Sequence, residues 1–475
     1  MFQNLIAGEW TGSNGAENIN PSNTNEVVGL YASADAKDVA NAIAAAKAAF
    51  PAWSRSGIWE RHVILKKAGD EIMARKDELG ALLAREEGKT LPEAIGETIR
   101  AAQIFEFFAG EALRLAGEVL PSVRPNIGVE ITREPIGVIG IITPWNFPIA
   151  IPTWKIAPAL CYGNTVVFKP ADLVPGCSWA IVDILHRAGL PKGVLNLVMG
   201  KGSVVGQAML DSPELAGITF TGSVGTGKRV AVSSVEHNRK YQLEMGGKNP
   251  MVILDDADLA VAVEAAANSA FFSTGQRCTA SSRLIVTEGI HDRFVAAMTE
   301  KLKTLNVDDA MKPGTHIGPV VDEKQLKTDT DYIEIGKQEG AKLAFGGELI
   351  KRDTPGFYLQ PTLFTEATNQ MRISREEIFG PVASVIRVRD YEEALAVAND
   401  TPFGLSSGIA TTSLKHATHF KRNAEAGMVM VNLPTAGVDF HVPFGGRKGS
   451  SFGSREQGKY AAEFFTTVKT AYTLA

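Results

Sequence analysis

Residues 137–169 read GVIGIITPWNFPIAIPTWKIAPALCYGNTVVFK. A β-branched run at 137–142 leads into a polar turn around Asn146, then a long apolar stretch, then a second β-branched run at 165–168. Prolines interrupt the apolar stretch, and Lys155 lies inside it, so a membrane span is disfavoured. The pattern predicts a strand, a loop, a buried helix and a second strand.

The same alternation extends in both directions from this stretch. Helical spacing of apolar residues predicts that the chain opens with helices, at 34–50 and 59–87. Short β-branched runs and alanine-rich stretches then alternate, which is typical of βαβ units with buried parallel sheets. The expected fold class is therefore α/β. The predicted strands are 137–142, 165–168, 194–198, 218–221, 251–254, 284–286, 382–388 and 428–431.

Length and composition exclude several classes of protein. The chain has 475 residues, enough for two or three domains, with 45% hydrophobic and 21% charged residues. A net charge of −5 without a basic face disfavours nucleic acid and membrane surfaces as partners. The first residues show no leader segment, and the cysteines, Cys161, Cys177 and Cys278, lack metal-ligand spacing. We expect a cytoplasmic protein with free thiols and no metal.

Two glycine clusters follow predicted strands and precede predicted helices. The first, residues 200–206, is close to GxGxxG with one residue too many, and the second, residues 220–228, has glycines at 222, 225 and 227. Glycines permit close backbone approach, and a helix N-terminus offers free N–H groups to a phosphate. The second cluster is not a P-loop, because Arg229 replaces the hydroxyl residue that would bind magnesium. Each cluster could equally be a glycine-rich structural turn.

Three polar residues are candidates for catalysis. Cys278 lies in a polar segment next to the cation Arg277 and near a possible helix end, both of which favour a thiolate, whereas Cys161 and Cys177 have apolar neighbours. Glu244 ends a half-buried strand, as a surface charge or as a base with a raised pKa. Asn146 follows the carboxyl end of a strand, as a turn residue or as an oxyanion donor.

Six motifs in order resemble the aldehyde dehydrogenase superfamily, and the resemblance spans nearly the whole chain. They are PWNFP (144–148), FKPAD (168–172), FTGSVGTG (220–227), LEMGGK (243–248), GQRCT (275–279) and EEIFGPV (376–382), followed by PFGGRKG (443–449). Within that superfamily, residues 437–452 resemble the α-ketoglutaric semialdehyde (2,5-dioxovalerate) dehydrogenases.

The resemblance implies two Rossmann-like αβα domains and a small β arm. The NAD(P)-binding domain would comprise residues 1–116 and 137–246, and the catalytic domain residues 247–460. Residues 117–136 and 461–475 would form an oligomerisation arm that builds a homodimer or homotetramer.

The resemblance also implies a role for each site residue. Cys278 would attack the aldehyde, Asn146 would stabilise the oxyanion, and Glu244 would activate the hydrolytic water. NAD would be the cofactor, with NADP also used, and the second glycine cluster rather than the first would face the pyrophosphate. The predicted cofactor contacts are Ile142, Thr143, Pro144, Trp145, Lys169, Asp172, Gly202, Gly206, Phe220, Thr221, Gly222, Ser223, Gly225, Gly227, Glu377 and Phe379.

The implied reaction is oxidation of a short semialdehyde acid, 2,5-dioxopentanoate to 2-oxoglutarate. Arg277, Ser281 and Phe444 are the predicted substrate-binding residues, with Arg277 on the distal carboxylate. Succinate or glutarate semialdehyde, or a broad range of aldehydes, are the alternative substrates. A cysteine acyl hydrolase without nicotinamide is the non-redox alternative. A silent binding protein is disfavoured because it needs none of Cys278, Glu244 and Asn146.

Overall fold

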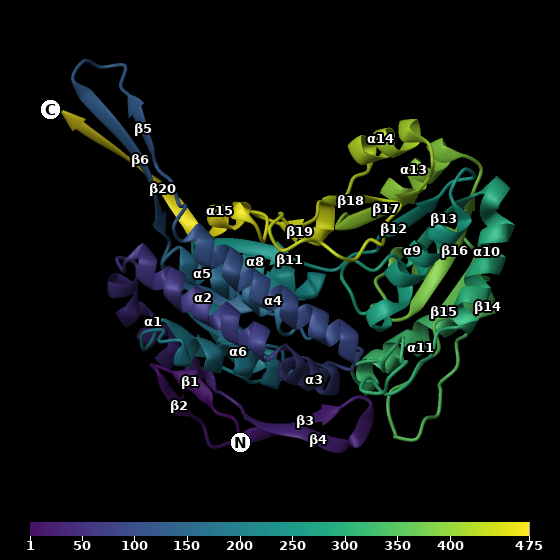
Figure 1. The fold of residues 1–475 in the computed structure, drawn as a ribbon, viewed down its shortest axis with the longest axis horizontal. Helices are drawn as coiled ribbons and strands as arrows, with labels where there is room; N and C mark the ends of the chain where they lie inside the picture. The colour runs from purple at the N-terminus through teal and green to yellow at the C-terminus, as the bar shows by residue number, and fades with distance from the viewer. Residues whose placement is uncertain (475) are drawn as a thin grey trace.

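The computed structural model describes residues 1–474 and contains two large sheets, each flanked by helices (Figure 1). The first sheet has eight strands in the order β19-β11-β10-β7-β8-β9-β1-β2, and its centre is parallel. The central strands are β7 (Val138–Ile142), β8 (Thr165–Lys169), β9 (Leu195–Leu197), β10 (Gly217–Thr221) and β11 (Lys240–Glu244). Its helices are α1 (Ala36–Trp53), α2 (Ile58–Ala74), α3 (Lys76–Glu87), α4 (Leu91–Glu111), α5 (Ala150–Cys161), α6 (Pro175–Arg187), α7 (Gln207–Asp211) and α8 (Val224–Glu236).

The second sheet has seven strands in the order β14-β15-β16-β13-β12-β17-β18, parallel except for β14. The strands are β12 (Pro250–Ile253), β13 (Arg283–Thr287), β14 (Lys342–Phe345), β15 (Thr362–Ala367), β16 (Val382–Val388), β17 (Ser406–Ala410) and β18 (Met428–Val431). The helices are α9 (Leu259–Phe271), α10 (Glu288–Lys303), α11 (Glu323–Gln338), α12 (Arg372–Arg375), α13 (Tyr391–Asn399) and α14 (Leu414–Asn423). The eight predicted strands are all present, and the predicted α/β class is confirmed.

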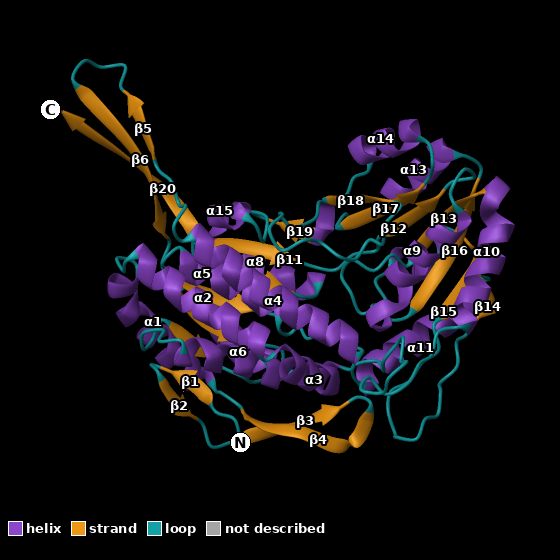
Figure 2. Cartoon of the chain, viewed as in Figure 1, coloured by secondary structure: helices purple, strands orange, loops and turns teal. Residues whose placement is uncertain are grey.

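A three-stranded antiparallel sheet projects from the first sheet's lobe, at the upper left of Figure 2. It consists of β5 (Glu118–Pro121), β6 (Ile127–Pro135) and β20 (Thr466–Leu474), and β20 pairs with β6 along its whole length. Apolar side chains such as Val119 and Leu474 are exposed on it. Residue 475, which the predicted arm includes, lies outside the described residues.

The expectation that the chain opens with helices is wrong. Four strands precede α1, namely β1 (Asn4–Ile6), β2 (Glu9–Thr11), β3 (Gly15–Asn20) and β4 (Asn23–Ala32). The first two are only three residues long, and β3 and β4 form a largely exposed hairpin, so they lack the apolar runs that mark buried strands. The expected helix at 59–87 is two helices, α2 and α3, which meet at Arg75.

The C-terminal residues also depart from the expected domain limits. β19 (Ser451–Phe452) lies within the expected catalytic domain, yet it pairs antiparallel with β11 of the first sheet. α15 (Ala462–Phe465) lies within the expected arm, yet Phe464 and Phe465 are buried in the core of the first lobe. A strand of two residues has no sequence periodicity, so only the fold reveals where this segment packs.

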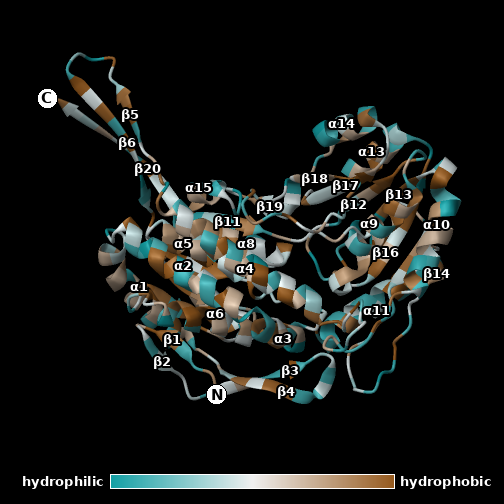
Figure 3. Ribbon diagram, in the orientation of Figure 1, coloured by the Kyte–Doolittle hydropathy of each residue, from teal (hydrophilic) through white to brown (hydrophobic). Residues whose placement is uncertain are grey.

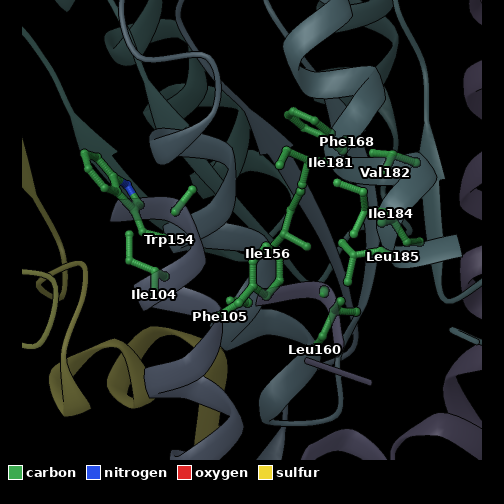
Figure 4. Close-up of a cluster of buried hydrophobic side chains, with 14 of the residues drawn as sticks. Ile104, Phe105, Trp154, Ile156, Leu160, Phe168, Ile181, Val182, Ile184 and Leu185 are labelled. Atoms are coloured by element: carbon green, nitrogen blue, oxygen red, sulfur yellow. The ribbon is translucent and has the colours of Figure 1, made fainter. Parts of the chain in front are cut away.

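Helix α5 packs into the apolar core directly after the loop that follows β7. Every residue of α5 is buried, and α4 and α6 cover it together with β8 (Figure 4). Burying one large apolar side chain contributes about 1.5–3 kcal/mol, so this core stabilises the loop at 143–149 between β7 and α5. Figure 3 shows the same hydrophobic character along the strands of the second sheet. Of the helices in residues 1–474, none has the length and apolar character needed to cross a bilayer.

Candidate active site

Cys278 follows a short, strained turn at the end of α9. Ser273, Thr274 and Gly275 all have positive φ (50°, 58° and 67°), and a Cβ at Gly275 would lie 2.2 Å from the Gly380 carbonyl oxygen. Left-handed backbone in non-glycine residues costs about 1–3 kcal/mol each and is common at active sites. The turn therefore places Cys278 just before β13, at the amino ends of the parallel strands of the second sheet, where Asn249 Nδ2 donates to its carbonyl oxygen at 2.8 Å.

The surroundings of the Cys278 thiol disfavour its thiolate form. Burial raises its pKa to about 12, and the charges of Glu244 and Glu377 contribute to the increase. Its own N–H and that of Thr279 act in the opposite direction. Desolvation and these two carboxylates oppose the stabilisation of the thiolate that was expected from Arg277.

Asn146 reaches Cys278 from the first lobe. It is buried in the loop between β7 and α5, and its Nδ2 donates to the Gln276 carbonyl oxygen at 3.0 Å. A side-chain amide has two N–H groups, so this bond leaves one available beside the cysteine. The arrangement fits an oxyanion donor held in place by the Cys278 segment itself.

Glu244 is buried at the end of β11. Burial raises its pKa well above the ordinary value, and the charge of Glu456 adds to the shift, while the Ser451 hydroxyl, which donates to Glu244 Oε2, opposes it. A Cβ at Gly445 would lie 2.7 Å from Glu244 Oε1, so only glycine fits above the carboxylate. A raised pKa suits a carboxylate that takes a proton near neutral pH.

A buried ion pair lies behind Glu244. Lys155 Nζ contacts Glu456 Oε1 and donates to Thr219 Oγ1 at 2.7 Å. The charge of Lys155 lowers the pKa of Glu244 and that of Glu456 raises it. The pair therefore shares an electrostatic environment with the candidate base.

The predicted cofactor contacts gather at one edge of the first sheet. Strands β10, β7 and β8 are adjacent and parallel, and their carboxyl ends carry Thr221, Thr143 and Lys169. In an open parallel sheet this edge is where ligands bind. Lys169 is buried, and its Nζ donates to Pro170 O at 2.8 Å and lies 4.0 Å from Asp172 Oδ1.

Both glycine clusters lie at this edge. A Cβ at Gly202 would be 3.9 Å from Lys169 Nζ, and a Cβ at Gly206 or Gly225 would meet no atom within 4 Å. Ser223 caps the N-terminus of α8, and Gly225 follows within the first turn. The second cluster thus presents an open helix N-terminus, whereas Gly222 and Gly227 are packed against Phe220 and Met245.

Glu377 and Phe379 extend from the second lobe toward this edge. Glu377 Oε1 accepts from Gly247 N at 2.8 Å, and burial raises its pKa to about 7. Phe379, with φ 65°, packs edge-on against Trp145 with ring centroids 5.4 Å apart. The Trp145–Phe379 contact joins the two lobes, and the Glu377–Gly247 bond lies where the chain passes from the first lobe into the second.

The residues at this edge fit a dinucleotide. Thr143 Oγ1 and Thr221 Oγ1 are buried and have no hydrogen-bond partner among the described residues. Buried polar atoms are nearly always satisfied, so such donors at a ligand-binding edge are available to a bound group. Hydroxyls, an open helix N-terminus and a lysine near a carboxylate match phosphate and ribose groups.

A cavity of about 330 Å³ leads to Cys278 between α4, α5 and the loop at 436–444. Phe147, Ile151, Trp154 and Phe444 give it apolar walls, and the Trp154 and Phe444 rings stack with centroids 5.4 Å apart. The charged side chains in its lining are Lys89, Glu93, Glu97, Arg100 and Arg277. Phe444, one of the predicted substrate-binding residues, therefore lines this cavity.

The contacts of Arg277 do not match its predicted role on a substrate carboxylate. Its Nη2 pairs with Glu93 Oε1 at 2.8 Å, its Nε donates to Ser273 Oγ at 3.0 Å, and its Nη1 donates to Asn268 Oδ1 at 3.3 Å. Each nitrogen is thus engaged and the charge is neutralised. Arg277 nevertheless lines the cavity, and its partner Glu93 is distant from it in sequence.

Ser281, which was predicted to bind the substrate, does not line the cavity. It is fully buried and outside the cavity lining, and its hydroxyl bonds to Thr435 Oγ1 at 2.8 Å. Thr435 in turn donates to Thr279 O at 2.8 Å. Ser281 therefore supports the loop that carries Ala436 and Val438, and does not face a substrate.

Sequence reasoning missed the residues that α4 contributes. Glu93, Gly96, Glu97 and Arg100 all line the cavity. Their spacing of three and four residues places them on one helix face, which a search for polar helix faces could have detected. No local signal indicated that this face meets Cys278.

Comparison with known proteins identifies the family. The family model described as "Aldehyde dehydrogenase family" matches residues 10–471. The chain belongs to the aldehyde dehydrogenase family. It is similar to the α-ketoglutaric semialdehyde dehydrogenase of Bacillus subtilis (strain 168), with 45% identity over 99% of this chain and 98% of that protein. It is also similar to the 2,5-dioxopentanoate dehydrogenase of Saccharolobus solfataricus, with 41% identity over 98% of each chain.

Solved structures agree with this assignment. Betaine aldehyde dehydrogenase from Staphylococcus aureus, in complex with NAD+, superposes with a TM-score of 0.97 at 34% identity, over 100% of this chain and 95% of that one. The prediction of an NAD(P)-dependent aldehyde dehydrogenase that acts on a small-molecule aldehyde is confirmed.

Proposed function

We propose that the protein oxidises a short ω-oxo acid, 2,5-dioxopentanoate first, to the corresponding dicarboxylate, 2-oxoglutarate. The observation that carries the proposal is the cavity at Cys278, which has apolar walls and a surplus of positive charge. The names of the similar proteins from Bacillus and Saccharolobus support the same substrate. Succinate and glutarate semialdehyde, which share the distal carboxylate, are the next candidates.

The first step forms a bond between Cys278 Sγ and the aldehyde carbon. The thiol must lose its proton, and its raised pKa means that ionisation occurs only when a base accepts that proton. The carbonyl oxygen becomes negatively charged, and the remaining Asn146 Nδ2 N–H and the Cys278 backbone N–H stabilise it. The product of this step is a thiohemiacetal on Cys278.

When NAD is bound, its chemistry is to accept a hydride from the thiohemiacetal carbon, which leaves a thioester on Cys278. Thr143, Thr221, Lys169 and the N-terminus of α8 would hold the adenosine and phosphate groups, and Glu377 and Phe379 the nicotinamide end. The remaining predicted contacts lie along the same sheet edge.

The second half of the reaction hydrolyses the thioester. Glu244 would accept a proton from water as the water oxygen attacks the acyl carbon, and Cys278 would leave as a thiolate. The raised pKa of Glu244 suits this task, because a base must have an affinity for the proton near neutral pH. The proton would then leave toward the Lys155 and Glu456 pair or solvent.

We also propose that the arm assembles the protein into a homodimer or homotetramer. Strands β20 and β5 form the two edges of this sheet, so their backbone N–H and C=O groups are available for pairing with a second copy. Their apolar side chains are exposed as well. The three cysteines are free, consistent with a reducing, cytoplasmic compartment.

A panel of aldehydes tests the proposed substrate. kcat/KM is measured from NADH absorbance for 2,5-dioxopentanoate, succinate semialdehyde, glutarate semialdehyde and pentanal, with NAD and with NADP. We expect the three acids to exceed pentanal by at least about tenfold, with 2,5-dioxopentanoate first. A higher kcat/KM for pentanal would contradict the proposal.

A further inference from the structure

The formal charges that line the cavity do not balance. Its cations are Lys89, Arg100 and Arg277, and its carboxylates are Glu93 and Glu97. Lys89 Nζ pairs with Glu97 Oε2 at 2.6 Å, and Arg277 pairs with Glu93 at 2.8 Å. Arg100 has no salt-bridge partner within residues 1–474. Among the charged residues that line the cavity, Arg100 is therefore the cation left without an ion pair, and the charge that acts on it most strongly from outside the lining is that of Asp439.

Arg100 is half-buried, and its side-chain donors are poorly satisfied. Its single side-chain hydrogen bond in the described part of the chain runs from Nη2 to Gln457 Oε1, a neutral acceptor, at 2.9 Å. Its Nε is buried without a partner. Burial lowers the pKa of Arg100, while the charges of Asp439, Glu97 and Cys278 oppose that shift. A buried N–H donor without a partner, such as Arg100 Nε, costs free energy unless an acceptor binds to it.

The walls of the cavity connect Arg100 to the nucleophile. The Arg100 Cζ lies over the Trp154 ring, 5.9 Å from its centroid, and Trp154 stacks on Phe444. Cys278 packs against the small cluster that contains Phe444. An apolar chain lying along these two rings would thus have one end at Cys278 and the other at the guanidinium.

We propose that Arg100 is the specificity-determining residue that binds the distal carboxylate of the substrate, the role assigned to Arg277 from the sequence. The inference rests on the proposed function, because it requires an aldehyde with a negatively charged far end. Guanidinium groups bind carboxylates through two parallel hydrogen bonds, and a desolvated pair of this kind discriminates strongly against neutral analogues.

The test compares Arg100→Met with Arg277→Met. Methionine keeps an unbranched apolar stem, so the packing of position 100 on Trp154 is largely retained. For Arg100→Met we expect kcat/KM for the ω-oxo acids to fall about 100-fold, while kcat/KM for pentanal changes less than about threefold. Arg100→Lys, which keeps the charge without the fork, should retain an intermediate preference for the acids.

Arg277→Met is the matched control. It lines the same cavity, but its charge is neutralised by Glu93, so its loss should change kcat/KM for acids and for pentanal by the same factor. If instead Arg277→Met removed the preference for acids and Arg100→Met kept it, the assignment to Arg100 would be overturned.

A binding measurement avoids dependence on turnover. Glutaramate, which has an amide in place of the aldehyde and keeps the distal carboxylate, and its neutral analogue pentanamide are compared as protectants of Cys278 against iodoacetamide in wild type and Arg100→Met. We expect glutaramate to protect wild type at a concentration about tenfold lower than pentanamide, with no difference in Arg100→Met. Equal protection by both ligands in wild type would refute the anchor.

The outcomes distinguish the role of Arg100 as the carboxylate anchor from the identity of the proposed substrate. If wild type prefers a different anionic aldehyde and Arg100→Met abolishes that preference, the substrate is wrong and the anchor stands. If wild type prefers 2,5-dioxopentanoate and Arg100→Met keeps the preference, the substrate stands and the anchor falls. If wild type shows no preference for anionic aldehydes, both proposals fall.

Discussion

The cofactor side and the substrate side of the site at Cys278 present different chemical groups. On the cofactor side, the ends of β7, β8 and β10 and the first turn of α8 present glycines, threonine hydroxyls and backbone N–H groups. On the substrate side, α4 and α5 present ion pairs and aromatic rings. The cofactor side is therefore sensitive to steric change in the backbone, and the substrate side to changes in side-chain charge.

Cys278→Ala should abolish turnover and leave cofactor binding nearly unchanged. Without the thiol no covalent bond forms, and loss of a catalytic nucleophile typically costs about 10⁴-fold or more in turnover. The cofactor contacts lie on other residues, so the dissociation constant for NAD should stay within about twofold of wild type. NADH production measures the first effect, and fluorescence titration with NAD measures the second. Substantial residual turnover would exclude Cys278 as the nucleophile.

Alkylation of Cys278 in the cofactor-free protein should depend steeply on pH. The folded pKa of about 12 lies above the ordinary thiol value of 9.0, so the thiolate fraction is small at neutral pH. Below that pKa the fraction, and with it the iodoacetamide rate, rises about tenfold for each pH unit. Mass spectrometry of the labelled peptide measures the rate. A plateau near pH 7 would contradict the raised pKa and restore a stabilised thiolate.

Glu244→Gln should leave the cofactor and substrate sides intact and slow the step that follows them. A general base typically contributes about 10²–10⁴-fold, so the steady-state rate should fall by about 100-fold or more. A rapid burst of NADH, one per active site, should persist, because hydride loss precedes hydrolysis. Stopped-flow absorbance resolves the two phases. Loss of the burst would assign Glu244 to the first step.

The difference between the two sides also explains what could be predicted from the sequence. The cofactor side is local in sequence, since each strand end and its glycines form one continuous motif, and the structure places Lys169, Gly225 and Thr143 at one edge. The substrate side depends on pairs such as Glu93 with Arg277, 184 residues apart. Which of two arginines is neutralised depends on tertiary packing, so Arg277 was preferred and Arg100 was missed.

Short elements were missed for a related reason. β1 and β2 have three residues each and β19 has two, so no periodicity can develop in them. Their pairing partners, β9 and β11, decide their structure. Longer strands with continuous apolar runs, such as β16, were predicted with the correct ends.

Two glycine substitutions compare the sides directly. Cβ atoms at Gly225 in α8 and at Gly96 in α4 would each meet nothing within 4 Å, so alanine should fit both sites in the free protein. Both helices should gain about 0.4–1 kcal/mol, and the melting temperature should rise slightly. Gly225→Ala should raise the NAD dissociation constant about tenfold, because the methyl group occupies the expected position of the pyrophosphate.

Gly96→Ala should have the opposite selectivity. Gly96 lines the substrate cavity, so a methyl group there should raise KM for the aldehyde a few-fold and leave NAD binding unchanged. Calorimetric NAD titration and steady-state kinetics on both variants give the comparison. Equal effects of the two variants on NAD binding would contradict the division of the site into a cofactor side and a substrate side.

The smallest expected effect concerns Asp172, which lies beside Lys169 at the adenosine end of the cofactor side. Asp172 Oδ1 is 4.0 Å from Lys169 Nζ, and its side chain is 55% exposed. A carboxylate there repels a 2′-phosphate, but solvent screens an exposed charge, so we expect NAD preference with measurable NADP use.

Asp172→Asn removes the repulsion with little change in volume. kcat/KM for NADP should therefore rise about threefold to tenfold, while kcat/KM for NAD falls by less than about threefold. The gain should shrink at high salt, because screening already weakens the repulsion in wild type. Steady-state kinetics with both cofactors at two ionic strengths measure it. An NADP gain that does not depend on salt would mean that Asp172 acts through shape or hydrogen bonding, and the electrostatic account of cofactor choice would then be wrong.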